Sequence, residues 1–264
     1  MVVFYFYGQV IPERFAFEMS ATKTLTINNL GSGLIANLSI SVHASQINVK
    51  VETNSDYDII DLKNIVKSSV EMILDVFAAF LNGYAYNLDI ISGFKEGESP
   101  IVFNVAFNQV NKYIKESLKQ NGEEDLLKND IDKIFSVVLN GTLESYQFSR
   151  ALRDLKNAIN YSDDTGFFSY RAIEQIRGAF YRDEDKKNKR NSWDRLRDKL
   201  NIERAYIDKV GTYRGKQAHG IPTLMTSDER ADAIIRAWNI IYRFYRYLKN
   251  NKADLKEPNF PLLR

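Results

Sequence analysis

Cysteine is absent from the 264 residues of this chain. Without a thiol the protein can form no disulfide framework, no thiolate zinc site and no cysteine nucleophile, and this composition fits a reducing cytoplasm. Histidine is scarce as well, because the chain has two, His43 and His219, which lie 176 positions apart. Such a pair cannot supply a histidine zinc motif, whose ligands lie a few residues apart. We therefore expect no metal and no other cofactor.

Long hydrophobic runs are also absent, although 44% of the residues are hydrophobic. No window approaches the roughly 18 uninterrupted apolar residues of a membrane span, so we expect a cytoplasmic protein with no membrane contact. The apolar start, Met1–Tyr7, has no basic leader and no small-residue cleavage site, and this pattern predicts a strand rather than a signal peptide. The apolar content suffices for one large core or two modest ones.

Positive charge is scarce in the first half of the chain and abundant in the second. Residues 1–145 carry 11 Lys and Arg against 18 Asp and Glu, a balance of −7. Residues 146–264 carry 25 against 16, a balance of +9, and hold 15 of the 16 arginines. This asymmetry indicates two units with different partners, of which the basic one suits a polyanion such as RNA. The plainer interpretation is a set of helices with solvated basic faces.

The first part of the chain alternates in the manner of antiparallel strands. Its apolar and β-branched residues are separated by turn residues such as Asn28-Asn29 and Gly31-Ser32-Gly33. Asp58–Leu81 instead repeats its apolar residues every three to four positions, which predicts a long helix. We predict an α+β domain over 1–145, with an antiparallel sheet and one dominant helix. The expected strands are 1–10, 11–19, 23–27, 34–42, 46–52, 84–94 and 101–107, and two short helices are expected at 109–120 and 123–139.

The second part, 146–264, has a helical period throughout. Thr226–Glu229 supplies the capping chemistry of the last helix, and the charged run Asp183–Arg190 is predicted to be an exposed loop. We therefore predict an all-helical bundle that begins near residues 140–150 and contains no strand beyond residue 160. The expected helices are 146–160, 165–182, 192–200, 203–218 and 227–250.

Arg214 and His219 are the pair of residues in the basic half that can carry chemistry. An imidazole titrates near neutrality and can move a proton, and a guanidinium holds a phosphate in a fixed fork. RNA supplies its own nucleophile, the 2′-hydroxyl, so these two groups can cleave it without a metal. Next to them, Tyr213 and Lys216 are candidate substrate-binding residues. The alternative is that His219 belongs to a helix end and Arg214 is one more surface arginine.

Residues 146–264 resemble the HEPN superfamily of helical bundles. Arg214–His219 matches its Arg-x4-His spacing, Tyr170–Arg177 resembles its second-helix signature, and the Trp238–Leu248 face resembles its closing helix. Many members are dimeric, metal-independent endoribonucleases of toxin–antitoxin, phage-defence and RNA-processing systems, so the resemblance implies this activity. One departure is Gly215, where active members often carry Asn, Asp or His. Residues 1–145 resemble no family that we recognise, and we assign them a sensing or regulatory role.

The spacing of the motif sets a geometric condition. Five residues of an unbroken helix turn by about 500°, which leaves Arg214 and His219 about 140° apart around the axis. The two side chains share one face if the helix bends at Gly211, Gly215 or Gly220, or if two chains contribute to one site. A single histidine in the basic half of each chain also favours a homodimer formed through the C-terminal bundle.

Two further residue sets are open to two interpretations. Glu174 can orient Arg214 through a bidentate ion pair, or it can be a surface carboxylate. The arginines of the last helix, Arg236, Arg243 and Arg246, lie opposite its apolar arc. The first interpretation of this pattern is an ordinary amphipathic helix, and the second is a stripe that faces RNA.

The sequence thus supports three functions. The first is a metal-independent endoribonuclease, as a toxin or phage-defence effector. The second is a non-catalytic RNA-binding or assembly module with the same bundle. The third is a helical partner of a separate nucleotidyltransferase antitoxin, since the chain has no nucleotidyltransferase motif of its own.

Overall fold

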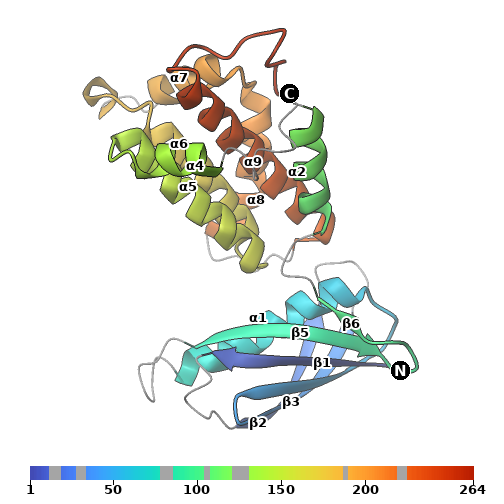
Figure 1. Cartoon of the computed structure of the whole chain (residues 1–264). Coiled ribbons are helices and arrows are strands. Elements are labelled where there is room, and N and C mark those ends of the chain that lie inside the picture. The colour runs from blue at the N-terminus through green and yellow to red at the C-terminus, as the bar shows by residue number, and fades with distance from the viewer. Residues whose placement is uncertain are drawn as a thin grey trace. The chain divides into compact units, whose positions relative to one another are not determined.

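The computed structural model describes residues 1–11, 19–27, 34–77, 86–103, 108–120, 131–186, 190–218 and 225–264. The chain forms two compact units, Met1–Val105 and Ala106–Arg264 (Figure 1). Each unit has its own core of buried apolar residues, one built on a sheet and the other on helices. No helix among the described residues is long and apolar enough to cross a membrane.

The N-terminal unit contains a six-stranded antiparallel sheet with the order β2-β3-β4-β1-β5-β6. Its strands are β1 (Val2–Ile11), β2 (Met19–Ile27), β3 (Leu34–His43), β4 (Gln46–Thr53), β5 (Asn87–Lys95) and β6 (Ile101–Val102). The prediction of an antiparallel sheet is therefore confirmed. The sheet is not a simple meander, because β1 lies between β4 and β5 and thus joins segments that are far apart in the sequence.

One helix, α1 (Ile59–Phe77), covers one face of this sheet. Residues on alternate positions of the strands, such as Phe4 and Phe6, are buried together with the apolar side of α1, including Leu62 and Val66. The period of two in the strands and the period of 3.6 in the helix together produce this two-layer core. The long helix predicted at 58–81 is confirmed over its described part.

Gly8 permits the one irregularity of the central strand. The register between β1 and β5 shifts between Tyr7 and Gly8. A Cβ atom at Gly8 would lie 2.0 Å from the carbonyl oxygen of Asp89, so the bulge requires a residue without a side chain.

One predicted strand of this unit differs from the structure, and another is not tested by it. The strand predicted at 101–107 is reduced to the two residues of β6, after which Phe103 packs into the core and residues 104–107 lie outside the described part. The strand predicted at 11–19 lies almost wholly outside the described residues.

The C-terminal unit is helical, as predicted. It contains α2 (Asn108–Gln120), α4 (Ile131–Leu139), α5 (Leu143–Asn160), α6 (Thr165–Gly178), the short 3-10 helix η2 (Asp183–Lys186), α7 (Arg190–Leu200), α8 (Arg204–Ala218) and α9 (Ser227–Lys249). All five helices predicted after residue 146 are present. The described residues beyond residue 146 form no strand, and a single isolated bridge joins Ile202 to Leu263.

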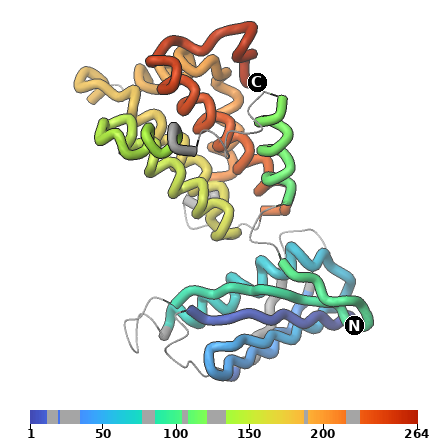
Figure 2. Tube along the Cα trace, viewed as in Figure 1, coloured from blue at the N-terminus to red at the C-terminus, as the bar shows by residue number. Residues whose placement is uncertain are grey.

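The boundary between the units lies after Val105 and not near residue 145, where the sequence places it. The reason is packing, because α2 lies beside α9 (Figure 2). Val110 and Leu118 of α2 belong to the helical core, and the Tyr113 hydroxyl is hydrogen bonded to the Asn239 amide. The change in charge at residue 145 therefore falls inside the helical unit.

Helix α9 is the central element of the bundle. Its apolar residues are buried on several sides, and its first turn is fixed by the predicted capping box between Thr226 and Glu229. Arg243 lies in this interior with 6% of its surface exposed. Its guanidinium donates hydrogen bonds to the carbonyl oxygens of Leu200, Asn201 and Pro261. The interpretation of Arg243 as part of an RNA-facing stripe is therefore wrong.

The charged run Asp183–Arg190 is also not simply an exposed loop. Residues 183–186 form η2, and Asp185 is fully buried. Its carboxylate accepts hydrogen bonds from the Arg182 backbone amide and from the Arg195 guanidinium of α7. A buried carboxylate needs such partners, and here they attach the run to the bundle.

Candidate functional site

Helix α8 carries the predicted site, and its packing sets the direction of Arg214. The side chain of Arg214 reaches α6, where its guanidinium carbon lies 4.7 Å from the centre of the Tyr170 ring. Its Nη1 atom lies 3.8 Å from Oε1 of Glu174, and 35% of the Arg214 side chain is exposed. The guanidinium of Arg214 therefore packs against an aromatic ring through a cation–π contact and is still accessible to solvent.

Glu174 is the predicted partner of Arg214, and the two residues are in contact. The contact is a single long ion pair and not the bidentate pair that was one of the two interpretations from the sequence, in which two N–O distances would be about 2.8 Å. A guanidinium has five N–H donors. Glu174 can thus orient Arg214 without occupying the fork geometry that a phosphate needs.

Beyond Arg214, further aromatic and cationic side chains contact one another in sequence across α6 and α7. The Tyr170 ring lies 6.0 Å from that of Trp193 in α7, and the guanidinium carbon of Arg177 lies 5.0 Å from the Trp193 ring centre. All of these side chains are half-buried. Burial, followed by the charge of Glu174, raises the pKa of Tyr170, which keeps its hydroxyl neutral. Two cations, Arg214 and Arg177, and two aromatic rings thus lie together on one side of the bundle.

Sequence reasoning gave no role to Tyr170 or Trp193. A signal for Tyr170 was present, because Tyr170, Glu174 and Arg177 have the i, i+4, i+7 spacing that places three side chains on one helix face. Trp193 comes from another helix, and its place beside Tyr170 depends on tertiary packing.

Tyr213 faces α9 and not the Arg214 side of α8. Its hydroxyl donates a hydrogen bond to Oδ2 of Asp232 at 3.0 Å, and Arg236 Nε contacts both oxygens of the same carboxylate. Burial and Asp232 raise the pKa of Tyr213 to about 12. The hydroxyl thus fastens α8 to α9, and the predicted role of Tyr213 in substrate binding stays a prediction.

Two of the predicted site residues are not described in full. His219 lies outside the described residues, and so does the side chain of Lys216, whose backbone belongs to α8. The helix runs without a break through Gly211 and Gly215 to Ala218. The helix is therefore not interrupted at either of these two glycines. Four helical residues turn by about 400°, so Ala218 lies within about 40° of Arg214 around the axis.

Gly215, the departure from the HEPN pattern, faces open space. A Cβ atom placed on it would meet no atom within 4 Å. A larger residue therefore fits without a clash, and the glycine is not required by packing.

We expect Gly215→Ala to raise the free energy of unfolding by about 0.5–1 kcal/mol, because alanine loses less backbone entropy than glycine in a helix interior. Urea denaturation measures the change. Gly211→Ala is the matched control, since its Cβ would lie in van der Waals contact with the Tyr170 ring, at 3.4 Å, and should give a gain at least as large. A loss of stability in Gly215→Ala would contradict the open environment.

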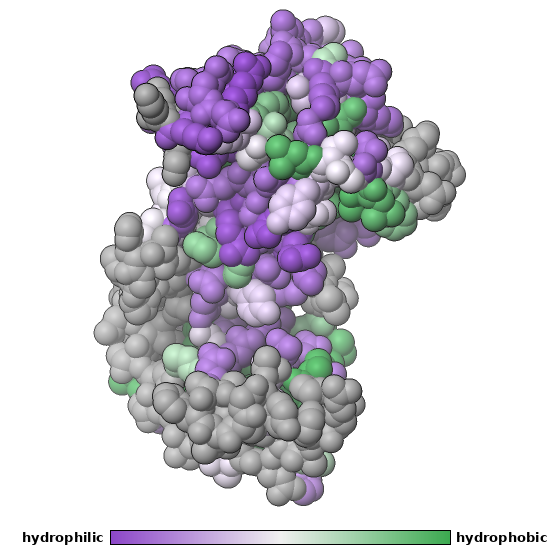
Figure 3. Space-filling view, turned by 90° about the vertical axis from the view of Figure 1, so that its left-hand side faces the viewer, coloured by the Kyte–Doolittle hydropathy of each residue, from purple (hydrophilic) through white to green (hydrophobic). Residues whose placement is uncertain are grey.

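The two units differ in charge. Residues 1–105 carry 6 Lys and Arg against 11 Asp and Glu, a net charge of −5, and residues 106–264 carry 30 against 23, a net charge of +7. Hydrophilic residues dominate the face of the helical unit seen in Figure 3. Among the described residues, no group of three or more His, Asp or Glu side chains is placed to hold a metal ion. The candidate site thus lies in the basic unit.

Two family models match the chain, and their limits agree with the two units. The DUF8168 N-terminal domain matches residues 4–103, and the DUF8168 C-terminal domain matches residues 131–249. The chain carries both domains of the DUF8168 family. The C-terminal DUF8168 domain contains Arg214, Glu174 and His219, and the N-terminal one contains the sheet and α1. No curated protein and no solved structure matches the chain.

Proposed function

We propose that this protein is a metal-independent RNA endonuclease, with Arg214 and His219 as catalytic residues and with a HEPN-like helical bundle as its C-terminal domain. The observation that carries the proposal is the placement of Arg214. Its guanidinium is part-exposed, rests on Tyr170 and is oriented by Glu174, in the basic unit of the protein. In the sequence, His219 directly follows Ala218, the last described residue of the same helix.

The reaction needs three groups. A base removes the proton of the 2′-hydroxyl, the 2′-oxygen attacks the adjacent phosphorus, and the bond from phosphorus to the 5′-oxygen breaks as an acid protonates that oxygen. His219 is the proton carrier, and Arg214 stabilises the negative charge that develops on the phosphorane oxygens. The products are a 2′,3′-cyclic phosphate and a free 5′-hydroxyl. Cleavage of labelled RNA in excess EDTA tests the proposal.

The one histidine of the helical unit, His219, cannot easily act as both base and acid in a single turnover. Two chains related by a twofold axis would bring two imidazoles and two guanidiniums to one scissile phosphate. Such a nuclease is suited to act as a toxin or a phage-defence effector, in which the N-terminal α+β unit restrains or triggers the helical unit.

We expect light scattering at micromolar concentration to give twice the 30.5 kDa mass of one chain. The reason is the site itself, which is incomplete in a monomer. A monomeric protein that still cleaves RNA would contradict the shared site, and a monomer without activity would contradict the dimer.

A second function is favoured by Gly215, since it replaces the polar residue that often follows the arginine in active HEPN members. In this case the bundle binds RNA or a partner protein and does not turn over. A Cβ atom at this position meets no neighbour within 4 Å among the described residues, so Gly215→Asn is the substitution that tests this second function. RNA binding without cleavage by the wild type, together with cleavage gained by Gly215→Asn, would favour this second function.

A further inference from the structure

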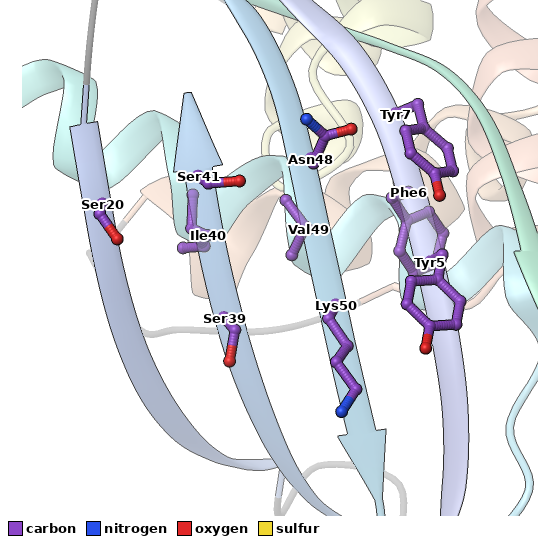
Figure 4. A pocket seen from close by; sticks show the side chains of 10 residues that line it. All are labelled: Tyr5, Phe6, Tyr7, Ser20, Ser39, Ile40, Ser41, Asn48, Val49 and Lys50. Atoms are coloured by element: carbon purple, nitrogen blue, oxygen red, sulfur yellow. The ribbon is translucent and has the colours of Figure 1, made fainter. Parts of the chain in front are cut away.

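The sheet of the N-terminal unit has a second face, opposite the face that packs on α1. Side chains alternate along a strand, so burial of Phe4 and Phe6 directs Tyr5 and Tyr7 to this other face. A groove of about 400 Å³ lies there across four neighbouring strands, β1 to β4 (Figure 4). The side chains of Ser39, Ser41 and Asn48 in it are exposed.

The strand register arranges this face in two parallel rows. In the first row Tyr5 is opposite Lys50, which is opposite Ser39. In the second row Tyr7 is opposite Asn48, which is opposite Ser41, and Ser20 follows on β2. Each row therefore begins with an aromatic ring on β1, continues with a nitrogen-bearing side chain on β4, and ends with hydroxyl groups. The serine side chains are small, so the groove is deeper over β3 than beside the rings of β1.

The aromatic end of the rows is a platform of three rings. Phe94 of β5 is stacked against Tyr5, with ring centres 5.0 Å apart and planes 27° apart. It is also stacked near Tyr7, at 6.1 Å and 17°. Near-parallel rings on an open sheet are a surface on which a planar base can stack. Packing of the fold does not require these rings, because the core lies on the other face.

Lys50 is the charged residue of the groove. Its ammonium is ion paired with Glu52 at 2.6 Å, and 42% of its side chain is exposed. An ammonium has three donors, and one bond to Glu52 leaves capacity for an anionic ligand. The adjacent Ser39 hydroxyl is a further donor in the same row.

We propose that this groove binds a nucleotide, with its base stacked on the Tyr5 and Tyr7 rings, against which Phe94 packs from β5, and its phosphate held by Lys50 and Ser39. A volume of about 400 Å³ is in the range of small-molecule sites. The net charge of −5 on residues 1–105 opposes a long nucleic acid strand, which is bound through many phosphate contacts. A ligand with one or two phosphates carries fewer charges against this opposition, and its phosphate meets the ammonium of Lys50 beside Glu52. The proposal depends on neither Arg214 nor His219.

The experiment is isothermal titration calorimetry of the full chain with AMP, GMP, CMP and UMP. Three further probes test the separate contributions of the base, the phosphate and the strand. Adenosine lacks the phosphate, and ribose 5-phosphate lacks the base. A single-stranded RNA hexamer carries the same bases and phosphates as parts of one strand. The His219→Ala chain is used with the hexamer so that cleavage cannot disturb the measurement. We expect saturable binding of at least one mononucleotide, weaker binding of its nucleoside, and none of ribose 5-phosphate.

Two variants assign the binding to the groove. Tyr7→Ala should weaken nucleotide binding by roughly tenfold or more, since it removes one stacking surface. Tyr181→Ala is the matched control, because Tyr7 and Tyr181 are both 38% exposed and Tyr181 belongs to the helical unit. Lys50→Met should lower the affinity for the nucleotide, leave that for the nucleoside unchanged and reduce the dependence on salt. Circular dichroism confirms that each variant is folded.

The proposal is overturned if no mononucleotide binds, if Tyr181→Ala weakens binding as much as Tyr7→Ala, or if ribose 5-phosphate binds as well as the nucleotides. A hexamer that binds a hundredfold more tightly than any mononucleotide, through Tyr7, would identify single-stranded RNA as the occupant instead. None of these results depends on whether the protein cleaves RNA, so the two proposals fail separately.

Discussion

His219→Ala is expected to slow RNA cleavage by roughly 10²–10⁴-fold, the usual contribution of a general acid or base. Arg214→Ala should slow it by a similar order, about 10²–10³-fold, through loss of a charge that stabilises the phosphorane. Both variants should remain folded, because Arg214 is part-exposed and holds Glu174 through one long ion pair. Initial rates on a 5′-labelled RNA panel in excess EDTA measure the effect.

The chain offers a matched control for each change. His43→Ala removes the other histidine, which lies at the end of β3 in the N-terminal unit. Arg204→Ala removes another cation of α8, which is exposed and paired with Asp208. Both controls should cleave at the wild-type rate. Lys216→Ala should act on binding, with a loss that shrinks at high salt. Equal rates for His219→Ala and His43→Ala would show that the imidazole at 219 carries no proton in the reaction.

Arg243→Met is expected to lower the free energy of unfolding by about 3 kcal/mol or more. The substitution removes the Arg243 donor from the carbonyl oxygens of Leu200, Asn201 and Pro261, of which the Asn201 oxygen keeps the Leu263 amide as a second donor. Each buried polar group without a partner costs about 1–3 kcal/mol. Burial lowers the pKa of Arg243 to about 10, so the guanidinium is charged at neutral pH.

Arg246→Met is the matched control for this change. Arg246 lies on the same helix, is part-buried and has its guanidinium carbon 5.5 Å from the Phe260 ring centre. Its replacement should cost about 1 kcal/mol or less, as is usual for a partly exposed contact. Urea denaturation of the two variants gives the comparison. Similar losses in both would contradict a central role for Arg243 in joining α9 to the C-terminal segment.

The sequence predicts the helices well because their signals are local. The apolar period, and caps such as Thr226 with Glu229, involve residues a few positions apart. Pairing of β1 with β4 and β5 joins residues separated by tens of positions, and no local pattern specifies this order. The error at the domain boundary has a similar origin. The sign of the charge changes at residue 145, whereas the core that includes Val110 begins before it.

Arg243 shows why a helical wheel cannot assign a surface. It lies opposite the apolar arc of α9, and the sequence therefore places it in solvent. In the structure, the turn at Leu200 and Asn201 and the segment around Pro261 cover that side and offer carbonyl oxygens to the guanidinium. Of the candidate site, the sequence predicts the contact of Arg214 with Glu174. Tyr170, whose ring lies against Arg214, and Trp193, whose ring lies against Tyr170, belong to two other helices that meet α8 only after folding.

The groove on the sheet depends both on local alternation within a strand and on the register between strands. Alternation in β1 predicts that Tyr5 and Tyr7 share a face, but the register determines that Lys50 and Asn48 are opposite them. A sheet with another strand order would separate the rings from the cation.

The most direct test of the central proposal is the chemical nature of the cleaved ends. Wild-type protein and His219→Ala are incubated side by side with labelled RNA in excess EDTA, and the 3′ ends are identified by mass spectrometry. We predict 2′,3′-cyclic phosphate or 3′-phosphate ends from the wild type, no cleavage at a site that carries a single 2′-deoxy sugar, and little product from His219→Ala. Cleavage that requires magnesium, that proceeds at a 2′-deoxy site, or that is equally fast in His219→Ala would contradict the assignment of Arg214 and His219 as a ribonuclease centre.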